Sequence, residues 1–377
     1  MFGVYVHIPF CAARCDYCDF ATWTDRSELI DDYVDACVVD LERRARDGLR
    51  DATSVFFGGG TPSLVPAEHL TRILDAIPRA AGAEVTVECN PDSIDAPKLA
   101  AYVRAGVTRV SLGVQSMVPH VLRALHRTHD PANVATAVAA ARDAGIATMN
   151  VDVIYGTPGE SDADWRHTLD AVLALDTPHL SAYALTVEPA TPLGLRVAAG
   201  DARAPDDDVQ ADRYRVTDAT LRAAGLDWYE LSNWARPGHE CRHNLLTWRQ
   251  GDYLAIGCAA HGHTGGRRWW NVRTPERYIE RIRAGRSPEQ GSEVLDDASR
   301  AEEGFTLALR TRTGAAVAER AASEVATLLD AGLVVRAGHR VVLTTAGRML
   351  ANDITARLLA AGAAAPPGPH AAPAGTR

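Results

Sequence analysis

The sequence of 377 residues contains no apolar run that approaches the roughly 18 residues needed for a membrane-spanning helix. Its first residues, MFGVYVHIPFC, also lack the charged start, the apolar stretch and the small-residue cleavage site of a signal peptide. They alternate instead in the way a strand does. We therefore expect a cytoplasmic protein whose association with a membrane is at most peripheral.

Lysine is almost absent, because Lys98 is the single lysine and scattered arginines carry the rest of the positive charge. The net charge is −9. A nucleic-acid partner is held through clustered positive charge that contacts phosphates, so this composition argues against one. Hydrophobic residues make up 46% and charged residues 23%, which is typical of a globular protein with a sizeable core.

Seven cysteines form no regular framework, and a cytoplasmic location keeps thiols reduced, so a disulfide scaffold is excluded. Only Cys11, Cys15 and Cys18 are clustered. Three patterns fit them. A structural zinc site takes four ligands, and only His7 lies nearby to complete it. A Cys-x-x-Cys redox pair leaves Cys11 without a role. A cubane iron–sulfur cluster on three thiolates keeps one iron open for a small molecule.

Short β-branched segments alternate along the chain with segments of helical length, which predicts parallel βαβ units. Strands are expected at 4–8, 54–57, 84–88, 109–113, 149–154 and 180–185. Helices are expected at 27–47 with Ser27 as N-cap, from Pro66 onward as first residue, at 131–144 and at 162–175. Polar and glycine-rich motifs follow the strands, which favours an open or closed β/α barrel with its site at the strand ends.

The chain is expected to divide into four parts. Residues 1–235 form the β/α barrel, and residues 236–290 form an extension packed on it. From about Glu293 the regular alternation of strand and helix segments ends. The sequence pattern there predicts a small winged-helix-like α+β domain at 291–360, built from two helices, a hairpin and a last helix. The Ala/Pro/Gly-rich tail at 361–377 has too few bulky apolar groups to pack and is predicted to be disordered.

The spacing C-x-x-x-C-x-x-C, with Tyr17 before the third cysteine, resembles the signature of the radical S-adenosylmethionine (SAM) superfamily. The resemblance implies an α/β fold, a partial (β/α)6 barrel. It also implies that Cys11, Cys15 and Cys18 bind a 4Fe–4S cluster whose open iron binds SAM. In such a protein the chain holds the cluster, orients SAM and excludes oxygen.

Further motifs resemble one branch of that superfamily, which contains oxygen-independent coproporphyrinogen III oxidase and its heme-chaperone relatives. They are YVHIPFC, FFGGGTPSL, ECNPD, RVSLGVQS, VDVIYGTPGE and HLSAYALTVEP, in that order. The resemblance implies a SAM pocket made by Tyr5, Tyr17, Gly59, Gly60, Thr61, Glu88, Gln115, Arg127 and Asp152. Each of these also has a structural interpretation, as a tight turn or a satisfied polar group at a strand end.

Two features separate the members of this branch. The oxidases carry a fourth cysteine two positions after the third, where this chain has Phe20, as the chaperones typically do. The stretch HNLLTW at 243–248 resembles the chaperones' H-N-x-x-Y-W, which is linked to heme binding. It makes His243, Asn244 and Trp248 heme-binding candidates, although Thr247 replaces the motif's tyrosine. The alternative is that His243 and Asn244 shape a loop by hydrogen bonding.

The resemblance therefore implies a heme chaperone that binds heme, a 4Fe–4S cluster and SAM, and that delivers heme to acceptor proteins such as respiratory proteins. An electron donor is a further expected partner. The alternative function is oxidative decarboxylation of coproporphyrinogen III, and a third is radical SAM chemistry on another substrate. Phe20 and the HNLLTW stretch favour the chaperone, so no catalytic residue is assigned.

Overall fold

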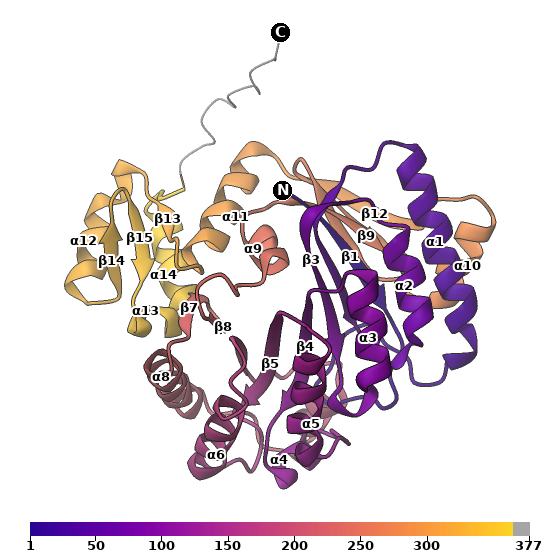
Figure 1. Ribbon diagram of the computed structural model, residues 1–377. Helices are drawn as coiled ribbons and strands as arrows, with labels where there is room; N and C mark the ends of the chain where they lie inside the picture. Colours follow the sequence, from indigo (N-terminus) through magenta and orange to yellow (C-terminus); the bar gives the residue numbers. More distant parts are fainter. Residues whose placement is uncertain (365–377) are drawn as a thin grey trace.

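The structure, a computed structural model, describes residues 1–364, so the predicted disorder of the tail lies from residue 365 onward outside the described residues (Figure 1). Six parallel strands follow one another in the sheet in chain order, each joined to the next by a helical segment, which confirms the predicted βαβ units. They are β1 (Phe2–Ile8), β2 (Ala52–Gly59), β3 (Arg79–Cys89), β4 (Arg109–Gln115), β5 (Thr148–Tyr155) and β6 (His179–Ala184).

Alternation along the strands separates an outer face from an inner one. In β1, Val4 and Val6 are fully buried in the main hydrophobic core, while Tyr5 and His7 point to the opposite, concave side. The outer face is covered by α1 (Ile30–Arg46), α2 (Ala67–Asp75), α3 (Ala96–Ala105), α5 (Pro131–Asp143), α6 (Asp162–Leu173) and α8 (Asp207–Ala223) (Figure 1). No helix within residues 1–364 has both the length and the apolar character needed to cross a membrane.

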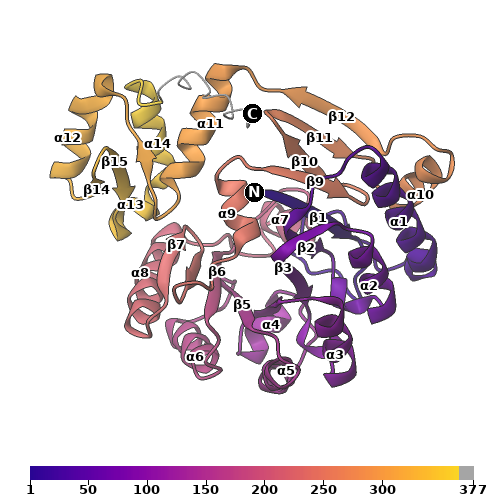
Figure 2. The same cartoon turned by 45° about the horizontal axis from the view of Figure 1, so that its top comes forward.

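The sheet continues past the six parallel strands on both sides to a total of twelve strands (Figure 2). Beside β6 lie β8 (Asn233–Ala235) and β7 (Asp227–Glu230), and beside β1 lie β9 (Asp252–Ile256), β10 (His261–Thr264), β11 (Arg267–Asn271) and β12 (Glu289–Val294). Figure 2 shows how the sheet curls, with α9 (Arg242–Trp248) on its concave side. The expected extension at 236–290 thus continues the barrel sheet, and its expected end falls inside β12.

The last part of the described chain has a hydrophobic core of its own. A three-stranded sheet, in the order β13-β15-β14, packs with four helices. These elements are α11 (Asp297–Leu309), β13 (Ala315–Ala316), α12 (Ala322–Asp330), β14 (Val334–Ala337), β15 (Arg340–Leu343), α13 (Thr345–Met349) and α14 (Ala351–Ala360). Residues 361–364 still belong to it, because Ala363 is fully buried and its carbonyl accepts the N–H of Ala318 at 2.9 Å.

Two helix starts differ from the prediction. Ser27 makes no capping hydrogen bond; it begins a short 3-10 turn, Ser27–Leu29, and α1 starts only at Ile30. Pro66 precedes α2 instead of forming its first residue, since its ψ of 141° is extended. In both cases the helical backbone begins one or more residues later than predicted. The exact first residue of a helix is its least predictable feature. The remaining α-helices of residues 1–364 are α4 (Pro119–Ala124), α7 (Pro192–Ala199) and α10 (Pro275–Arg283).

Candidate functional site

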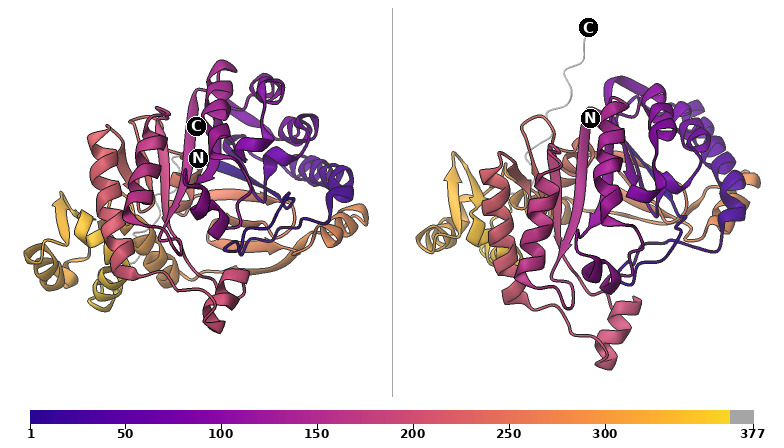
Figure 3. Two further views of the ribbon diagram at one scale, coloured as in Figure 1. Left: turned by 90° about the horizontal axis from the view of Figure 1, so that it is seen from below. Right: turned by 60° about the horizontal axis from the view of Figure 1, so that its bottom comes forward.

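The segments that follow the parallel strands enclose a cavity of about 490 Å³ at one end of the barrel. Figure 3 (left) looks onto the side of the molecule where these segments lie. The three clustered cysteines line the cavity together with eight of the nine predicted SAM-pocket residues, namely Tyr17, Gly59, Gly60, Thr61, Glu88, Gln115, Arg127 and Asp152. They meet because the carboxyl ends of parallel strands lie at one edge of the sheet.

The loop that carries the cysteines is pinned at both ends. The N–H of Cys11 donates to the carbonyl of Trp23 at 3.0 Å, and the N–H of Trp23 donates to the carbonyl of Pro9 at 2.8 Å. In the middle, the carbonyl of Asp16 accepts the N–H of Leu193, the second residue of α7, at 3.0 Å. The loop is therefore held in place from β1 and from the segment after β6, while its cysteines stay accessible from the cavity.

The three cysteines lie in a partly buried, polar environment. The hydroxyl of Thr61 lies 3.7 Å from Sγ of Cys11, and Nη1 of Arg127 lies 3.6 Å from Sγ of Cys15. Burial raises the pKa of Cys11, and it raises that of Cys18 to about 11. Without a metal the Cys11 and Cys18 thiols therefore hold their protons, and coordination to iron would supply the positive charge that their thiolates need there.

A single metal ion does not fit these donors. Within residues 1–364, no group of three His, Cys, Asp or Glu side chains converges on one ion position. His7, the imidazole that is nearest in the sequence, donates from Nε2 to the carbonyl of Ala21 at 2.9 Å and accepts at Nδ1 from the Tyr5 hydroxyl at 3.2 Å. Both of its nitrogens are engaged. Three separated thiols suit a cubane, in which each thiolate binds its own iron.

The glycines at the end of β2 fit tightly against β1. A Cβ at Gly59, whose φ is +107°, would lie 2.3 Å from Nδ1 of His7, and a Cβ at Gly60 would lie 2.8 Å from the carbonyl oxygen of Ile8. The N–H of Gly59 donates to Glu88 at 3.2 Å, and the N–H of Gly60 donates to Ile8 at 2.8 Å. With these donors already used, the segment offers acceptors, which suit a ligand ammonium group.

Two carboxylates face the cavity from neighbouring parts of the sheet. Burial, followed by the charge of Asp152, raises the pKa of Glu88 to about 8. The hydrogen bond from the Gly59 N–H acts in the opposite direction and lowers this pKa. Burial also raises the pKa of Asp152, whose oxygens accept from the hydroxyl of Ser111 and the amide of Asn150, each at 2.8 Å. The ionised forms of these two buried acids are disfavoured by burial and by their mutual repulsion. A cationic ligand such as a sulfonium would stabilise the ionised forms.

Arg127 and Gln115 complete the polar wall. Nη2 of Arg127 donates to the carbonyl of Gly113 at 2.6 Å. Gln115 has a φ of +63°, a conformation that L residues adopt rarely and that often marks a functional site. A Cβ at Gly113 would approach Nε2 of Gln115 to 3.0 Å, so this glycine makes room for both side chains.

We predict that Glu88 makes the stability of the protein free of cluster and SAM depend on pH. Its folded-state pKa of about 8 exceeds the usual 4.5, so the protonated carboxyl stabilises the fold. That contribution is complete below pH 4.5, is lost as the pH rises to about 8, and is on the order of a few kcal/mol. Denaturant unfolding of the parent should show this decline. Glu88→Gln, which imitates the protonated acid, should remove the part of the decline that Glu88 causes and leave the part due to Glu160 and Glu230, whose pKa values burial also raises to about 7. Equal slopes for both proteins would contradict the assignment.

Several cavity residues were missed by the sequence analysis. Asn90, Ser111, Tyr183, Thr186 and Glu188 also line the cavity. The sequence motifs that contain these residues were expected to contribute to the site, but none of these residues was predicted individually as a ligand contact. Ser111 and Tyr183 alternate with buried core residues on β4 and β6, so their inward direction follows from the period of two once the strands are known.

Tyr5 is the predicted SAM-pocket residue that does not line the cavity. It lies below the cavity on the concave face, where its ring stacks on Phe56 with centroids 6.3 Å apart. The ring of His243 is 6.4 Å from Tyr5 and 5.3 Å from Phe56, measured between centroids, so the three rings form one cluster. The Tyr5 hydroxyl bonds to Nδ1 of His7 at 3.2 Å.

The heme-binding candidates lie away from this cavity, near the beginning of the parallel strands. His243 is only 5% exposed, its Nδ1 lies 3.1 Å from the hydroxyl of Ser54, and burial lowers its pKa to about 4. Asn244 and Trp248 are half-buried on α9. The hydroxyl of Thr247, at the position of the motif's tyrosine, donates to the carbonyl of Asn244 at 2.8 Å. The structure therefore does not bring these candidates together with the cysteines.

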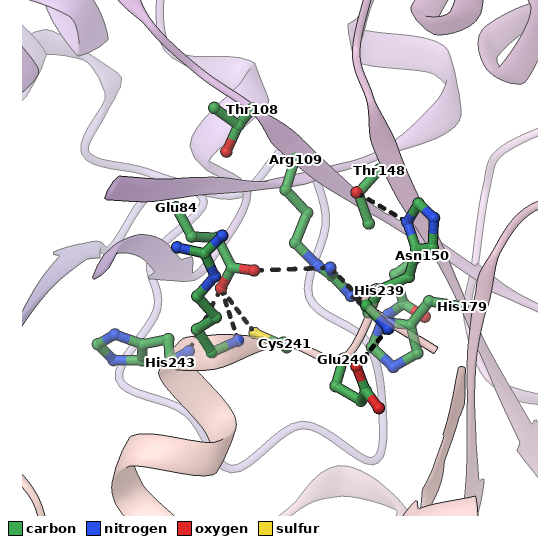
Figure 4. Close-up of polar contacts among 12 residues, drawn as sticks. Glu84, Thr108, Arg109, Thr148, Asn150, His179, His239, Glu240, Cys241 and His243 are labelled. Atoms are coloured by element: carbon green, nitrogen blue, oxygen red, sulfur yellow. Dashed lines mark hydrogen bonds and ion pairs between the residues drawn. The ribbon is translucent and has the colours of Figure 1, made fainter. Parts of the chain in front are cut away.

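A buried ion pair holds the start of α9 (Figure 4). Oε1 of Glu84 accepts the N–H groups of Arg242 and His243 at 2.8 and 3.3 Å, and Oε2 lies 3.7 Å from Nη1 of Arg109. Arg109 also donates twice, at 2.9 Å, to the carbonyl of His239. Cys241 is buried with Sγ 3.6 Å from Glu84, and its pKa is raised to about 12, mainly by burial. These groups anchor the helix.

Comparisons with known proteins agree with this arrangement. Residues 5–172 match the family described as the Radical SAM superfamily. The chain is 44% identical over 369 residues to the heme chaperone HemW of Mycobacterium tuberculosis, which covers 95% of both chains. It is 32% identical to HemW of Bacillus subtilis, covering 94% of this chain and 98% of that one. The solved structure of coproporphyrinogen III oxidase (HemN) from Escherichia coli superposes with a TM-score of 0.82 at 22% identity, covering 95% of this chain and 89% of that one.

The barrel and the cysteine-lined cavity define a radical SAM protein, a class that implies a 4Fe–4S cluster and SAM as cofactors. The likeness to the oxidase concerns the fold alone. Within that class, the identity along nearly the whole chain is decisive: the chain belongs to the HemW family of radical SAM heme chaperones.

Proposed function

We propose that this protein binds heme as cargo and passes it to acceptor proteins, and that its cluster and SAM site serve this task. The observation that carries the proposal is the 44% identity to a heme chaperone over 95% of the chain. Respiratory heme proteins are the acceptors that the sequence analysis suggests, and an electron donor would serve the cluster.

In this proposal Cys11, Cys15 and Cys18 hold the cluster. Gly59, Gly60, Thr61, Glu88, Gln115, Arg127 and Asp152 form the SAM pocket, with Tyr5 supporting it from below. When bound, the cluster and SAM supply one-electron reduction and a reactive carbon centre. The chain's own part is to orient SAM and keep water away. Tyr17 supports that part, because it packs on an apolar cluster around Leu125, Ile154 and Leu185 beside the cysteine loop.

Phe20 supports the chaperone over the oxidase. Its side chain is 59% exposed and lines the cavity, so a ring occupies the place where the oxidases carry a fourth cysteine. Ligand cavities are lined largely by apolar and aromatic side chains, so the exposed Phe20 ring is available to a ligand in this cavity. A porphyrin is flat and largely apolar, and an aromatic ring offers it a matching surface.

Two parallel assays test the function. Protein reconstituted anaerobically is titrated with hemin, and we expect a saturable shift of the Soret band. The same preparation, given coproporphyrinogen III, SAM and a reductant, should form no protoporphyrinogen. The control is the Cys11→Ala/Cys15→Ala/Cys18→Ala protein, which cannot perform radical SAM chemistry. Turnover by the parent above this control, or a failure of the parent to bind hemin, would overturn the proposal.

A further inference from the structure

Buried polar side chains continue inward from the cavity between β5 and β6. Side chains alternate along a strand, so Asn150 and Asp152 of β5 face the same side, as do His179 and Ser181 of β6. The two strands pair with Asn150 opposite His179 and Asp152 opposite Ser181. Asp152 lines the cavity, whereas the other three residues are only 1–4% exposed. Polar groups buried in this way are stable only when they bond to one another.

Hydrogen bonds connect these residues from Asp152 to His179. Nδ2 of Asn150 donates to Oδ1 of Asp152 and to Oγ of Ser181, each at 2.8 Å. Oγ of Ser181 donates to Oδ1 of Asn233 on β8 at 2.7 Å. The same oxygen lies 2.8 Å from Nε2 of His179. The carboxylate in the cavity is therefore joined to an imidazole that lies nearer the beginning of the strands.

From this imidazole the contacts reach α9 (Figure 4). Burial, followed by the charge of Arg109, holds the pKa of His179 well below its usual value, so the neutral ring accepts at Nδ1 from Nη2 of Arg109. Arg109 pairs with Glu84, whose Oε1 accepts the N–H groups of the first two residues of α9. The polar column, as we call this unbroken series, consists of Asp152, Asn150, Ser181, Asn233, His179, Arg109 and Glu84.

One member of the polar column faces more acceptors than it can serve. The amide nitrogen of Asn150 carries two hydrogens. Three oxygens lie within hydrogen-bond distance of it, because Oγ of Ser111 is 2.7 Å away in addition to Ser181 and Asp152. The Oδ1 of Asn150 has no hydrogen-bond partner within residues 1–364. An ionised Asp152 makes the strongest of the three bonds, so one serine goes without while nothing else neutralises that carboxylate.

We propose that the polar column couples the SAM pocket to α9. A cation in the pocket, such as the sulfonium of SAM, neutralises Asp152 and frees the Asn150 amide for Ser181. The serine hydroxyl is then fixed toward the lower part of the polar column, which holds the start of α9 more firmly. The inference deepens the proposed function and rests on it in one respect, because α9 carries the heme-binding candidates of HNLLTW.

Hydrogen exchange of the full reconstituted chain, with and without SAM, tests the coupling. No reductant is added, so SAM stays intact. In the parent, SAM should slow exchange at 242–248 by at least about fivefold, the lower end of typical coupling between two sites. Two variants interrupt the polar column at different points: Ser181→Ala removes the hydroxyl next to Asn150, and His179→Phe removes the imidazole next to Arg109. Each should still bind SAM, but SAM should no longer slow exchange at α9.

One matched variant and one matched ligand serve as controls. Thr355→Val removes a buried hydroxyl that donates to the carbonyl of Ala351 on α14, outside the polar column, and should respond to SAM as the parent does. S-adenosylhomocysteine, which lacks the sulfonium charge, should bind without slowing exchange at 242–248. Unchanged exchange in the parent, equal slowing in Ser181→Ala, or equal slowing by S-adenosylhomocysteine would each overturn the coupling. Cluster absorbance and thermal unfolding report the folding of each variant, and Ser181→Ala alone decides if His179→Phe does not fold.

Hemin titrations with and without SAM separate this inference from the proposed function. In a parent that binds hemin, SAM should change the hemin affinity, and Ser181→Ala should remove that change. If the parent binds no hemin, the proposed function fails, while the exchange measurement still decides whether the polar column couples the pocket to α9. Slowed exchange with an unchanged hemin affinity would overturn the link between α9 and the cargo.

Discussion

Replacing Cys11, Cys15 and Cys18 together by alanine is expected to abolish the brown 4Fe–4S absorbance, with the iron content falling from about four atoms per chain to near zero. The three thiols line one cavity, and a cubane needs them all because each binds a different iron. Iron analysis and visible absorbance after anaerobic reconstitution measure the effect.

The matched controls are two cysteines outside the cluster loop. Cys89→Ala removes a thiol at the cavity wall that is 5% exposed, and Cys241→Ala removes the buried thiol beside Glu84. Both should keep the parent's iron. A cluster that survives in the triple variant, or disappears in Cys89→Ala, would show that the chain ligates iron through other sulfurs.

Glu84→Ala is expected to lower the free energy of unfolding by about 3–5 kcal/mol. The Glu84 and Arg109 side chains are 9% and 2% exposed, so the variant leaves a guanidinium buried without its counter-ion. It also removes the acceptor for the two N–H groups at the start of α9. Denaturant unfolding measures the loss, and hydrogen exchange at 242–248 should rise more than elsewhere.

Two variants set the scale for this effect. Glu324→Ala removes one partner of a more exposed pair, in which a Glu324 oxygen lies 2.7 Å from Nη2 of Arg357, and should cost less than about 1 kcal/mol. Glu84→Gln keeps an acceptor for the helix but loses the charge, so its loss should be intermediate. A Glu84→Ala protein no less stable than Glu324→Ala would mean that Arg109 is well solvated or otherwise paired.

The strands and the cavity were largely predictable, because the sequence carries two independent signals for them. Short β-branched segments gave the order of β1 to β6, and polar motifs followed directly after them. Since all six strands are parallel, every such motif had to reach the same end of the sheet, and eight predicted residues line one cavity. Tyr5 is the exception. Its ring lies on the concave face below the cavity, stacked on Phe56.

The heme-binding candidates were less predictable, because a motif says nothing about exposure. HNLLTW forms α9, but its histidine turns toward Phe56 and Ser54 and is buried. Exposure depends instead on the register between strands, which local residues do not set, as in the pairing of His261 on β10 with Trp270 on β11.

By itself the sequence determined the local chemistry of this protein: three thiols within eight residues, glycines after β2, and a phenylalanine at position 20. Covalent spacing alone brings such groups together. Only the tertiary structure decided which distant side chains share a surface, such as Glu88 with Asp152 and His261 with Trp270. The physical reason is that strand pairing and alternation choose each side chain's face, and burial then decides whether it stays available to a ligand.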